Sequence, residues 1–597
     1  MAGRTGMRDT RRDEAEKASY DEATSRRFGS GHGYFGFGDG GGDLPLVFAI
    51  LMVFVILIVV KLGYVQLYMG EDLAKQAEEH RTNKIVLQAR RGTIYDRNGN
   101  VLAVSEECYD VCVNPKQIEE LKQVGEAIIV AKYLGGAAQD YLEIFKQDIT
   151  FSYLAHQADK TLCEDMVQEL RSGGYEGVYL VAQMRRAYPY GDLAGQVLGM
   201  VDRDGKGLTG LELQYDPWLK GEDGELIMET GLYGVPIAGA ASERTEPTDG
   251  MNLVLALDID VQRSVEENVL KGMEESKATS GFALVMDPRN GEIIAACSTP
   301  YADLTHEEMV SNEMLNLKLV SDCYEPGSIA KVLTAAIGLE SKTVDANDYF
   351  WVPYSIMVGD GIVFDVDDRN EWEQMNLREM LRRSSNVAAA LISQENIGAE
   401  NFAQGLESFG IGQLTGIDYP GEVPGLIKTL DEYDASSVGS MSFGQGFSVP
   451  MVQMCRAISA IADKGVMYTP HFAVSRGAKT LDWSKGEQAV SAEVAEQVAD
   501  MMVTVVEDGT AAEGAVEGYE VAAKTGTGEI AENGKYLKNK YLATLVGFAP
   551  AHDAQVLVCV GLRETPYLSY STAGPVFSAI MGEALSDLGV LAQDKGV

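Results

Sequence analysis

The sequence has few of the residues that build disulfide frameworks and metal sites. It contains seven cysteines and six histidines among 597 residues. The cysteines are scattered and odd in number, which argues against a disulfide framework. Cys108 and Cys112 are close in sequence, but their segment is typical of a strand, and four residues of strand span about 13 Å, beyond the roughly 7 Å that a disulfide tolerates. We therefore expect most cysteines to be small buried apolar side chains. Because the histidines are isolated and no HExxH or Cys/His cluster occurs, we predict no metal site and no cofactor.

Basic residues are also scarce. The chain has 49 lysines and arginines against 89 aspartates and glutamates, which gives a formal net charge of −40. A field of that sign repels phosphate backbones, so nucleic acid is not an expected partner. Since the chain is too long for one compact core, we expect at least two folded domains.

One stretch lacks charged and polar side chains altogether. Residues 44–60 are wholly apolar, and the run continues past Lys61 to Leu67. About 20 such residues can span the hydrocarbon of a bilayer. No small-residue cleavage site follows, so we interpret residues 44–67 as an uncleaved transmembrane anchor and not as a signal peptide. Residues 1–43 mix charges and glycines without apolar periodicity, which predicts a disordered tail.

The sequence pattern changes near residue 250, where we place a domain boundary. Between about 84 and 247 the segments are short, strand-like and punctuated by glycine. A strand at 252–257 then leads to Asp258 and Asp260, candidate helix caps. The helix after it would bury a stripe at helical spacing, formed by Val261, Val265, Val269, Leu270 and Met273. A strand, a turn and a second strand follow over 281–297.

Two residues of the C-terminal part form a first motif with chemical meaning. Ser328 and Lys331 are three residues apart at the start of a helical run, which stacks them on one face of the helix. A serine at a helix N-terminus lies where unpaired backbone N–H groups favour a developing oxyanion. The lysine can act as a base only if burial or a second cation keeps it neutral.

A second and a third motif supply further polar groups. Ser384 and Asn386 follow a helical stretch, where a hydroxyl could relay a proton and an amide could hold a substrate carbonyl. The third motif follows a short strand and consists of Lys524, Thr525, Gly526 and Thr527. It offers a cation that could depress the pKa of Lys331, a hydroxyl for a carboxylate, and a glycine that a substrate backbone could approach. Each motif alone is more often a polar helix junction or a glycine turn, whereas the ordered combination is specific.

In this order the motifs match those of the serine penicillin-recognising enzymes, and from about residue 84 to 590 the chain resembles the class B penicillin-binding proteins. The N-terminal part carries a similar signature over Arg91–Gly99, followed by Arg186, Pro189, Gly195, Gly199 and Glu212. Segments such as Tyr324–Ser328 and Asp418–Glu422 are most similar to the division and sporulation branch.

The resemblance implies a multidomain α+β chain. A single N-terminal transmembrane helix would precede a β-rich, elongated pedestal domain of the dimerisation type over 68–250. A penicillin-binding, β-lactamase-like transpeptidase domain would follow over 251–592, with an antiparallel sheet covered by helices.

The resemblance also implies a reaction in which Ser328 attacks the D-Ala-D-Ala carbonyl of a peptidoglycan stem peptide. Lys331 would take its proton, and the backbone N–H groups of Ser328 and Thr527 would form an oxyanion hole. An acceptor amine from a second strand would then resolve the acyl-enzyme, and β-lactams would be inhibitors.

The other site residues would act on the leaving group and the donor peptide. Ser384 and Lys524 would carry a proton to the departing D-Ala, while Asn386 and Thr525 would orient the donor beside Gly526. Such a substrate lies outside the cytoplasmic membrane, so the tail 1–43 would be cytoplasmic and the catalytic domain extracytoplasmic in a bacterium. Expected partners are the membrane, a polytopic glycan polymerase and other proteins of the division complex.

Four alternative functions share part of this pattern. A class A β-lactamase needs a Glu-x-x-Leu-Asn motif, which is absent between Asn386 and Lys524. A glycosyltransferase motif begins at Glu71, but Lys75 and Glu78 stand where it needs phenylalanine and histidine. A D,D-carboxypeptidase, and a β-lactam-binding sensor or scaffold of the septal complex, remain as alternatives that an assay separates.

Overall fold

The computed structural model describes residues 44–69, 82–229, 242–306, 309–367, 369–532 and 535–592. The predicted tail over 1–43 and the segment compared with a glycosyltransferase motif lie outside these residues. The chain divides into two units, one of residues 1–84 with 227–242 and one of residues 85–226 with 243–597.

The first unit contains the apolar helix α2 (Leu44–Leu67). Within the described residues it is the one helix long and apolar enough to cross a membrane, with a mean hydropathy of 3.0 over Leu46–Leu67. Its large apolar side chains, from Leu46 to Val60, are exposed, as expected for a helix that faces lipid on all sides. The length and composition of this helix support the predicted single-pass anchor.

A five-stranded antiparallel sheet forms the centre of the C-terminal part. Its order is β10-β9-β23-β22-β21, made of β9 (Ser280–Met286), β10 (Ile293–Ser298), β21 (Ala522–Glu532), β22 (Lys535–Ala549) and β23 (Val556–Thr565). Because β21 is at the edge, one side of its backbone is not paired within the sheet.

Helix α10 (Ile259–Ser276) begins where the sequence predicts. Asp258 caps it by accepting hydrogen bonds from the N–H groups of the next turn. Val261, Val265 and Val269 are buried, but Leu270 is 49% exposed, so its predicted burial was wrong. One residue is a rotation of about 100° on a helix, which carries Leu270 out of the buried stripe.

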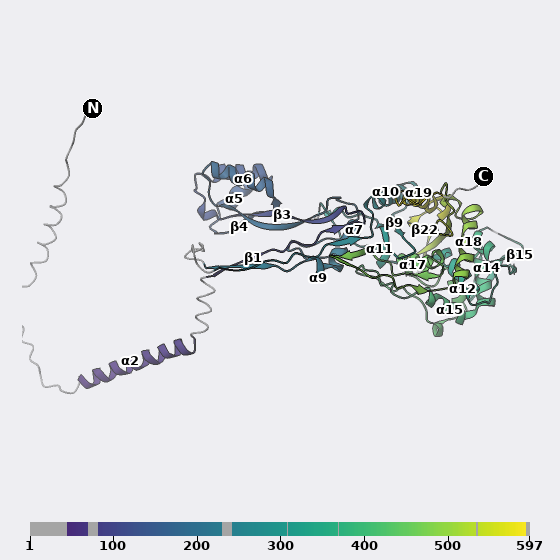
Figure 1. Cartoon of the computed structure of the whole chain (residues 1–597), viewed down its shortest axis with the longest axis horizontal. Coiled ribbons are helices and arrows are strands. Elements are labelled where there is room, and N and C mark those ends of the chain that lie inside the picture. The colour runs from purple at the N-terminus through teal and green to yellow at the C-terminus, as the bar shows by residue number, and fades with distance from the viewer. Residues whose placement is uncertain are drawn as a thin grey trace, which may run out of the picture. The chain divides into compact units, whose positions relative to one another are not determined.

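Helices cover both faces of the sheet (Figure 1). On one face, α10 packs against α19 (Ala573–Asp587) and both contact the sheet, while α17 (Met451–Ala462) contacts β22 and β23 from the opposite side. The other helices of this part are α11 (Lys318–Ser321), α12 (Ala330–Glu340), α13 (Leu377–Arg382), α14 (Asn386–Ile392), α15 (Gly398–Ser408), α16 (Ser437–Ser442) and α18 (Ala492–Asp508).

Short two-stranded ladders complete this part. The antiparallel pairs are β11 (Cys323–Tyr324) with β16 (Val449–Pro450), β12 (Phe350–Val352) with β15 (Glu373–Met375), β13 (Ser355–Val358) with β14 (Gly361–Phe364), and β17 (Val466–Met467) with β20 (Glu487–Gln488).

A mixed sheet crosses the position of the predicted boundary. It contains β2 (Ile94–Tyr95), β3 (Val101–Val113), β4 (Ser152–Asp159), β5 (Val178–Ala187), β8 (Leu253–Leu255), β18 (Ala473–Arg476) and β19 (Lys479–Thr480). β8 runs parallel to β2 and antiparallel to β18, so strands from both sides of residue 250 share one ladder. A further sheet consists of β1 (Thr82–Leu87), β6 (Gly224–Glu229) and β7 (Ser242–Thr245).

The β-rich N-terminal part also carries helices that the strand-like sequence pattern did not predict. They are α4 (Gln123–Leu134), α5 (Ala138–Phe145), α6 (Lys160–Ser172), and the short α7 (Gly195–Leu198), α8 (Gly210–Gln214) and α9 (Asp216–Leu219). α6 packs on β3, β4 and β5, and α4 packs against α5 and α6. Together they enclose a small core separate from the main one, and we call this assembly the head. Glu126 of α4 is fully buried there, with no hydrogen bond to its carboxylate oxygens among the described residues.

Three residues of the N-terminal signature meet in a buried ion-pair cluster. The Glu212 carboxylate accepts from Arg91 Nε at 2.6 Å and from Arg186 Nε at 2.6 Å. Arg91 also pairs with Asp216 at 2.6 Å. The Glu212 side chain is 0% exposed and those of the two arginines at most 5%. Neighbouring carboxylates raise the pKa of Arg91 against the effect of burial, so it stays charged.

The cysteines behave as predicted. All seven are unpaired, and all but Cys323 are buried. Cys108 and Cys112 lie four residues apart on β3, where extended geometry separates them.

Candidate active site

The serine of the first motif lies on a tight turn. Ser328 belongs to the 3₁₀ turn Gly327–Ile329, which leads directly into α12. The Gly327 N–H donates to the Gly444 carbonyl at 3.1 Å. A Cβ at Gly444 would lie 2.0 Å from Gly327 O, so this close approach requires glycine. Gly444 therefore fixes the backbone that presents Ser328.

The same turn packs against the edge strand β21. A Cβ on Gly526 would lie 2.4 Å from Thr544 Oγ1 and 2.9 Å from Pro326 O. The space beside Gly526 is thus filled by the serine turn and by β22. Packing alone explains this glycine, without the substrate approach that the sequence suggested.

Lys331 lies one helical turn after Ser328 and is 0% exposed. Its Nζ is 2.9 Å from Ser328 Oγ, 2.5 Å from the Ser384 carbonyl oxygen and 2.6 Å from Asn386 Oδ1. Every one of these contacts is to an uncharged oxygen. Within the described parts of the chain, no carboxylate forms an ion pair with this lysine.

The second motif reaches Lys331 through an unusual backbone conformation. Ser384 has φ 57°, in the left-handed region, between α13 and α14. Such a conformation in a non-glycine residue costs roughly 1–3 kcal/mol and is typical of functional sites. Ser385 then caps α14, and Asn386 is its first residue. The turn directs both the carbonyl and the hydroxyl of Ser384 toward the buried lysines.

Lys524 of the third motif completes a bridge through Ser384. Its Nζ lies 2.9 Å from Ser384 Oγ, and Lys331 Nζ lies 3.3 Å from the same oxygen. Lys524 is also 0% exposed, and its other contacts are the carbonyl and hydroxyl oxygens of Thr525. One hydroxyl therefore links two buried amines.

Burial changes the protonation of both lysines. It lowers the pKa of Lys331 to about 7, against an opposing effect of the Asp365 carboxylate. Burial, and then the charge of Lys331, lower the pKa of Lys524 well below its ordinary value. The sequence suggested a second cation as a cause for Lys331, whereas burial is the main cause here. A neutral Lys331 is thus available near neutral pH.

The remaining groups of the third motif have partners that the sequence did not predict. The Thr525 hydroxyl donates to Thr510 Oγ1 at 2.9 Å, and Thr527 Oγ1 lies 2.8 Å from Ser569 Oγ. No motif marks Thr510 or Ser569, because both reach β21 only through tertiary packing. A cleft of about 470 Å³ adjoins the end of this motif and is lined by residues that include Tyr324, Glu325, Phe447, Gly528 and Leu542.

Together these contacts form an arrangement that suits acyl transfer. It holds a half-buried hydroxyl, a buried amine in contact with it, a second amine and a bridging hydroxyl. A neutral amine beside a serine is a nucleophile with its base. The structure brings together Ser328, Lys331, Ser384, Asn386 and Lys524, with Thr525, Gly526 and Thr527 on the adjoining strand.

Two family models match the chain. Residues 86–255 match the penicillin-binding protein dimerisation domain, and residues 281–582 match the penicillin-binding protein transpeptidase domain. Stage V sporulation protein D of Bacillus subtilis is 30% identical over 559 residues, which cover 91% of this chain and 86% of that protein. The probable peptidoglycan D,D-transpeptidase PenA of Neisseria meningitidis is 32% identical over 535 residues, 88% of this chain and 89% of that protein.

A solved structure has the same architecture. Penicillin-binding protein 2X from Streptococcus thermophilus superposes with a TM-score of 0.72 at 26% identity, covering 84% of this chain and 80% of that chain.

Proposed function

The chain belongs to the class B penicillin-binding proteins, and on this premise we propose that it works through an acyl-enzyme formed on Ser328. The family and the relatives make it a peptidoglycan D,D-transpeptidase that cross-links stem peptides in division or sporulation. The observation that carries the mechanism is the 2.9 Å contact between Ser328 Oγ and the fully buried Lys331 Nζ.

The contacts of Lys331 favour its neutral form as the base. A neutral amine has two N–H groups and one lone pair. The Ser384 carbonyl at 2.5 Å and Asn386 Oδ1 at 2.6 Å can accept both N–H groups. The lone pair is then left for the proton of Ser328, which no protonated ammonium could take.

In the first step the Ser328 oxygen bonds to the carbonyl carbon of the penultimate D-Ala, and its proton passes to Lys331. The developing oxyanion accepts from the backbone N–H groups of Ser328 and Thr527. The carbon–nitrogen bond then breaks, and the departing D-Ala receives a proton through Ser384, whose hydroxyl contacts both Lys331 and Lys524. An acceptor amine next attacks the ester, loses a proton to the same relay and regenerates Ser328.

The remaining site residues would hold the donor peptide. Among the described residues, the side-chain NH₂ of Asn386 has no acceptor while its oxygen accepts from Lys331, so this group can donate to a substrate carbonyl. Thr525 and Thr527 flank Gly526 on the edge strand, and their hydroxyls would turn from Thr510 and Ser569 to donate to the terminal carboxylate of the donor.

We assign the pedestal to residues 68–250 and the transpeptidase domain to 251–592, which the two matching family models support. Because stem peptides lie outside the cytoplasmic membrane, α2 would orient the tail 1–43 inward and the catalytic domain outward. A bacterial single-pass protein of this topology needs fresh glycan at the membrane surface. Its partners would therefore be β-lactams, nascent peptidoglycan, a polytopic glycan polymerase and other division-complex proteins.

The decisive experiment is covalent labelling. The purified full chain should gain one β-lactam adduct by intact mass, and Ser328→Ala should gain none, because no other hydroxyl contacts the base as closely as Ser328. An adduct on the Ala variant would place the nucleophile elsewhere. A wild-type protein with no adduct would favour a catalytically idle scaffold of the septal complex.

A second assay separates transpeptidation from D,D-carboxypeptidation. Both reactions release D-Ala from a pentapeptide donor, but only transpeptidation forms a cross-linked dimer. Dimers detected by chromatography of digested product support our proposal, whereas D-Ala release without dimers would contradict it.

A further inference from the structure

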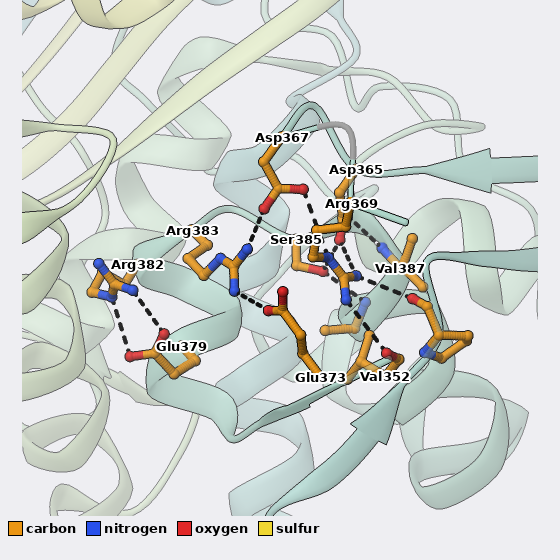
Figure 2. A network of polar contacts seen from close by, with 12 residues as sticks. Val352, Asp365, Asp367, Arg369, Glu373, Glu379, Arg382, Arg383, Ser385 and Val387 are labelled. Carbon is orange, nitrogen blue, oxygen red and sulfur yellow. Dashed lines mark hydrogen bonds and ion pairs between the residues drawn. The ribbon is translucent and has the colours of Figure 1, made fainter. Parts of the chain in front are cut away.

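The carboxylate of Asp365, which lies outside the three motifs, binds the segment of the second motif (Figure 2). Asp365 follows β14, and its side chain accepts from Ser385 Oγ at 2.7 Å and from the Val387 N–H at 3.0 Å. Ser385 Oγ in turn accepts from the Ala388 N–H. These bonds satisfy the otherwise unpaired N–H groups of the first turn of α14. Asp365 therefore fixes the helix start that carries Asn386.

Asp365 is itself buried beside a cation. Arg369 Nη2 lies 2.6 Å from Asp365 Oδ2, and each side chain is 4% exposed. The guanidinium also donates to the carbonyls of Val352 and Pro353. Removal of either partner would leave a buried charge uncompensated, as is general for such pairs. The pair is thus held between the β12 end and the start of α14.

The charge of Asp365 also acts on the proposed base. The groups that face Lys331 are Lys524 from β21, Asp365 from the segment after β14, and the uncharged oxygens of the first two motifs. Asp365 raises the pKa of Lys331 while burial lowers it. A carboxylate paired with a guanidinium exerts a weaker field on a third group than an unpaired carboxylate does.

The neighbouring charges are more exposed and, within the described residues, reach Arg369 only through Asp367. Arg383 contacts Asp367 and Glu373, all three at least 26% exposed (Figure 2). Asp367 also lies 3.7 Å from Arg369 Nε. These more exposed pairs are screened by solvent, so they act weakly on the buried base.

We propose that Asp365 and Arg369 are positioning residues for the second motif, and that Arg369 cancels enough of the Asp365 charge to keep Lys331 neutral at working pH. The proposal rests on the proposed function, because it concerns the base of that reaction. One carboxylate thereby anchors the motif, and its partner arginine limits the electrostatic cost to the base.

The test is the pH dependence of β-lactam acylation by the purified full chain. Asp365→Asn removes the negative charge and should move the rising limb of the profile of acylation rate against pH to lower pH. Arg369→Gln leaves the carboxylate unpaired and should move it to higher pH. We expect each shift to be about one pH unit, the size produced by a single nearby charge. Arg369→Lys keeps the charge and should return the limb toward the wild-type position.

The matched control is Arg383→Gln, an arginine of the same network that does not contact Asp365. It should leave the limb in place. Intact mass gives the fraction of competent protein, so poor folding lowers the amplitude and leaves the midpoint readable. If wild type is acylated and the limbs of all variants coincide, or shift in the same direction, our inference is wrong. If wild type is never acylated, the proposed function itself is wrong.

Discussion

The pedestal and the active site both bury cations, with opposite results. In the pedestal, Arg91 and Arg186 share the Glu212 carboxylate at 2.6 Å each, and Arg91 stays charged. In the active site, Lys331 and Lys524 are equally buried but contact only uncharged oxygens. A guanidinium keeps its proton whatever its partner, whereas a buried amine without a carboxylate partner can lose its proton, so the first cluster is a structural link and the second suits the proposed base.

The largest effect is expected from removing the buried amine of Lys331. We predict that Lys331→Met lowers the acylation rate by on the order of 10³-fold, because the serine loses its base. The variant should unfold at the wild-type temperature or above, since methionine fills the space and no carboxylate is left unpaired. Stopped-flow acylation and a thermal melt measure the two quantities. A strong loss of stability would show that Lys331 is also a structural residue.

Removing the carboxylate of the pedestal cluster should instead lower stability and leave acylation unchanged. Glu212→Gln leaves Arg91 and Arg186 without the carboxylate that they share, and we expect the free energy of unfolding to fall by about 3–5 kcal/mol. Denaturant unfolding measures this change, and acylation per folded molecule should stay constant. Lys160→Ala, which breaks an exposed pair with Glu107, is the control and should not shift the midpoint. If Glu212→Gln and Lys160→Ala changed the free energy of unfolding equally, the buried cluster would not be a structural link.

The smallest expected effect is the pH response of the wild-type protein. With the pKa of Lys331 at about 7, the acylation rate should fall about tenfold from pH 8 to pH 6. The folded state releases this proton at lower pH than the unfolded state, so the unfolded chain binds more protons above pH 7. Stability from this group therefore rises with pH in that range. A flat acylation profile would show that Lys331 is not the base.

Much of the site could be predicted because its motifs are local. Three-residue spacing on a helix brings Ser328 next to Lys331, and the alternation of side chains along a strand sets the arrangement of the third motif. Asp365, Thr510 and Ser569 were missed because they reach the motifs only through tertiary packing. The helices of the head were missed since short glycine-punctuated segments are typical of strands. The predicted burial of Leu270 was wrong because the rotation of one residue on a helix separates a buried face from an exposed one.

The separate small core of the head has a consequence for cooperativity. Glu126 lies inside it, its carboxylate oxygens make no hydrogen bond to the part of the chain that the structure describes, and burial raises its pKa to about 7. A segment with few apolar contacts and a buried polar liability opens at lower free energy than the main core. Amide hydrogens in α4, α5 and α6 would then exchange through local opening, while those of α12 and β21 exchange only on global unfolding. Because the folded head holds the Glu126 proton up to about pH 7 and the unfolded head releases it earlier, the stability of the head falls as pH rises toward 7. The head can therefore yield to heat, rising pH or protease while the proposed site at Ser328 stays folded.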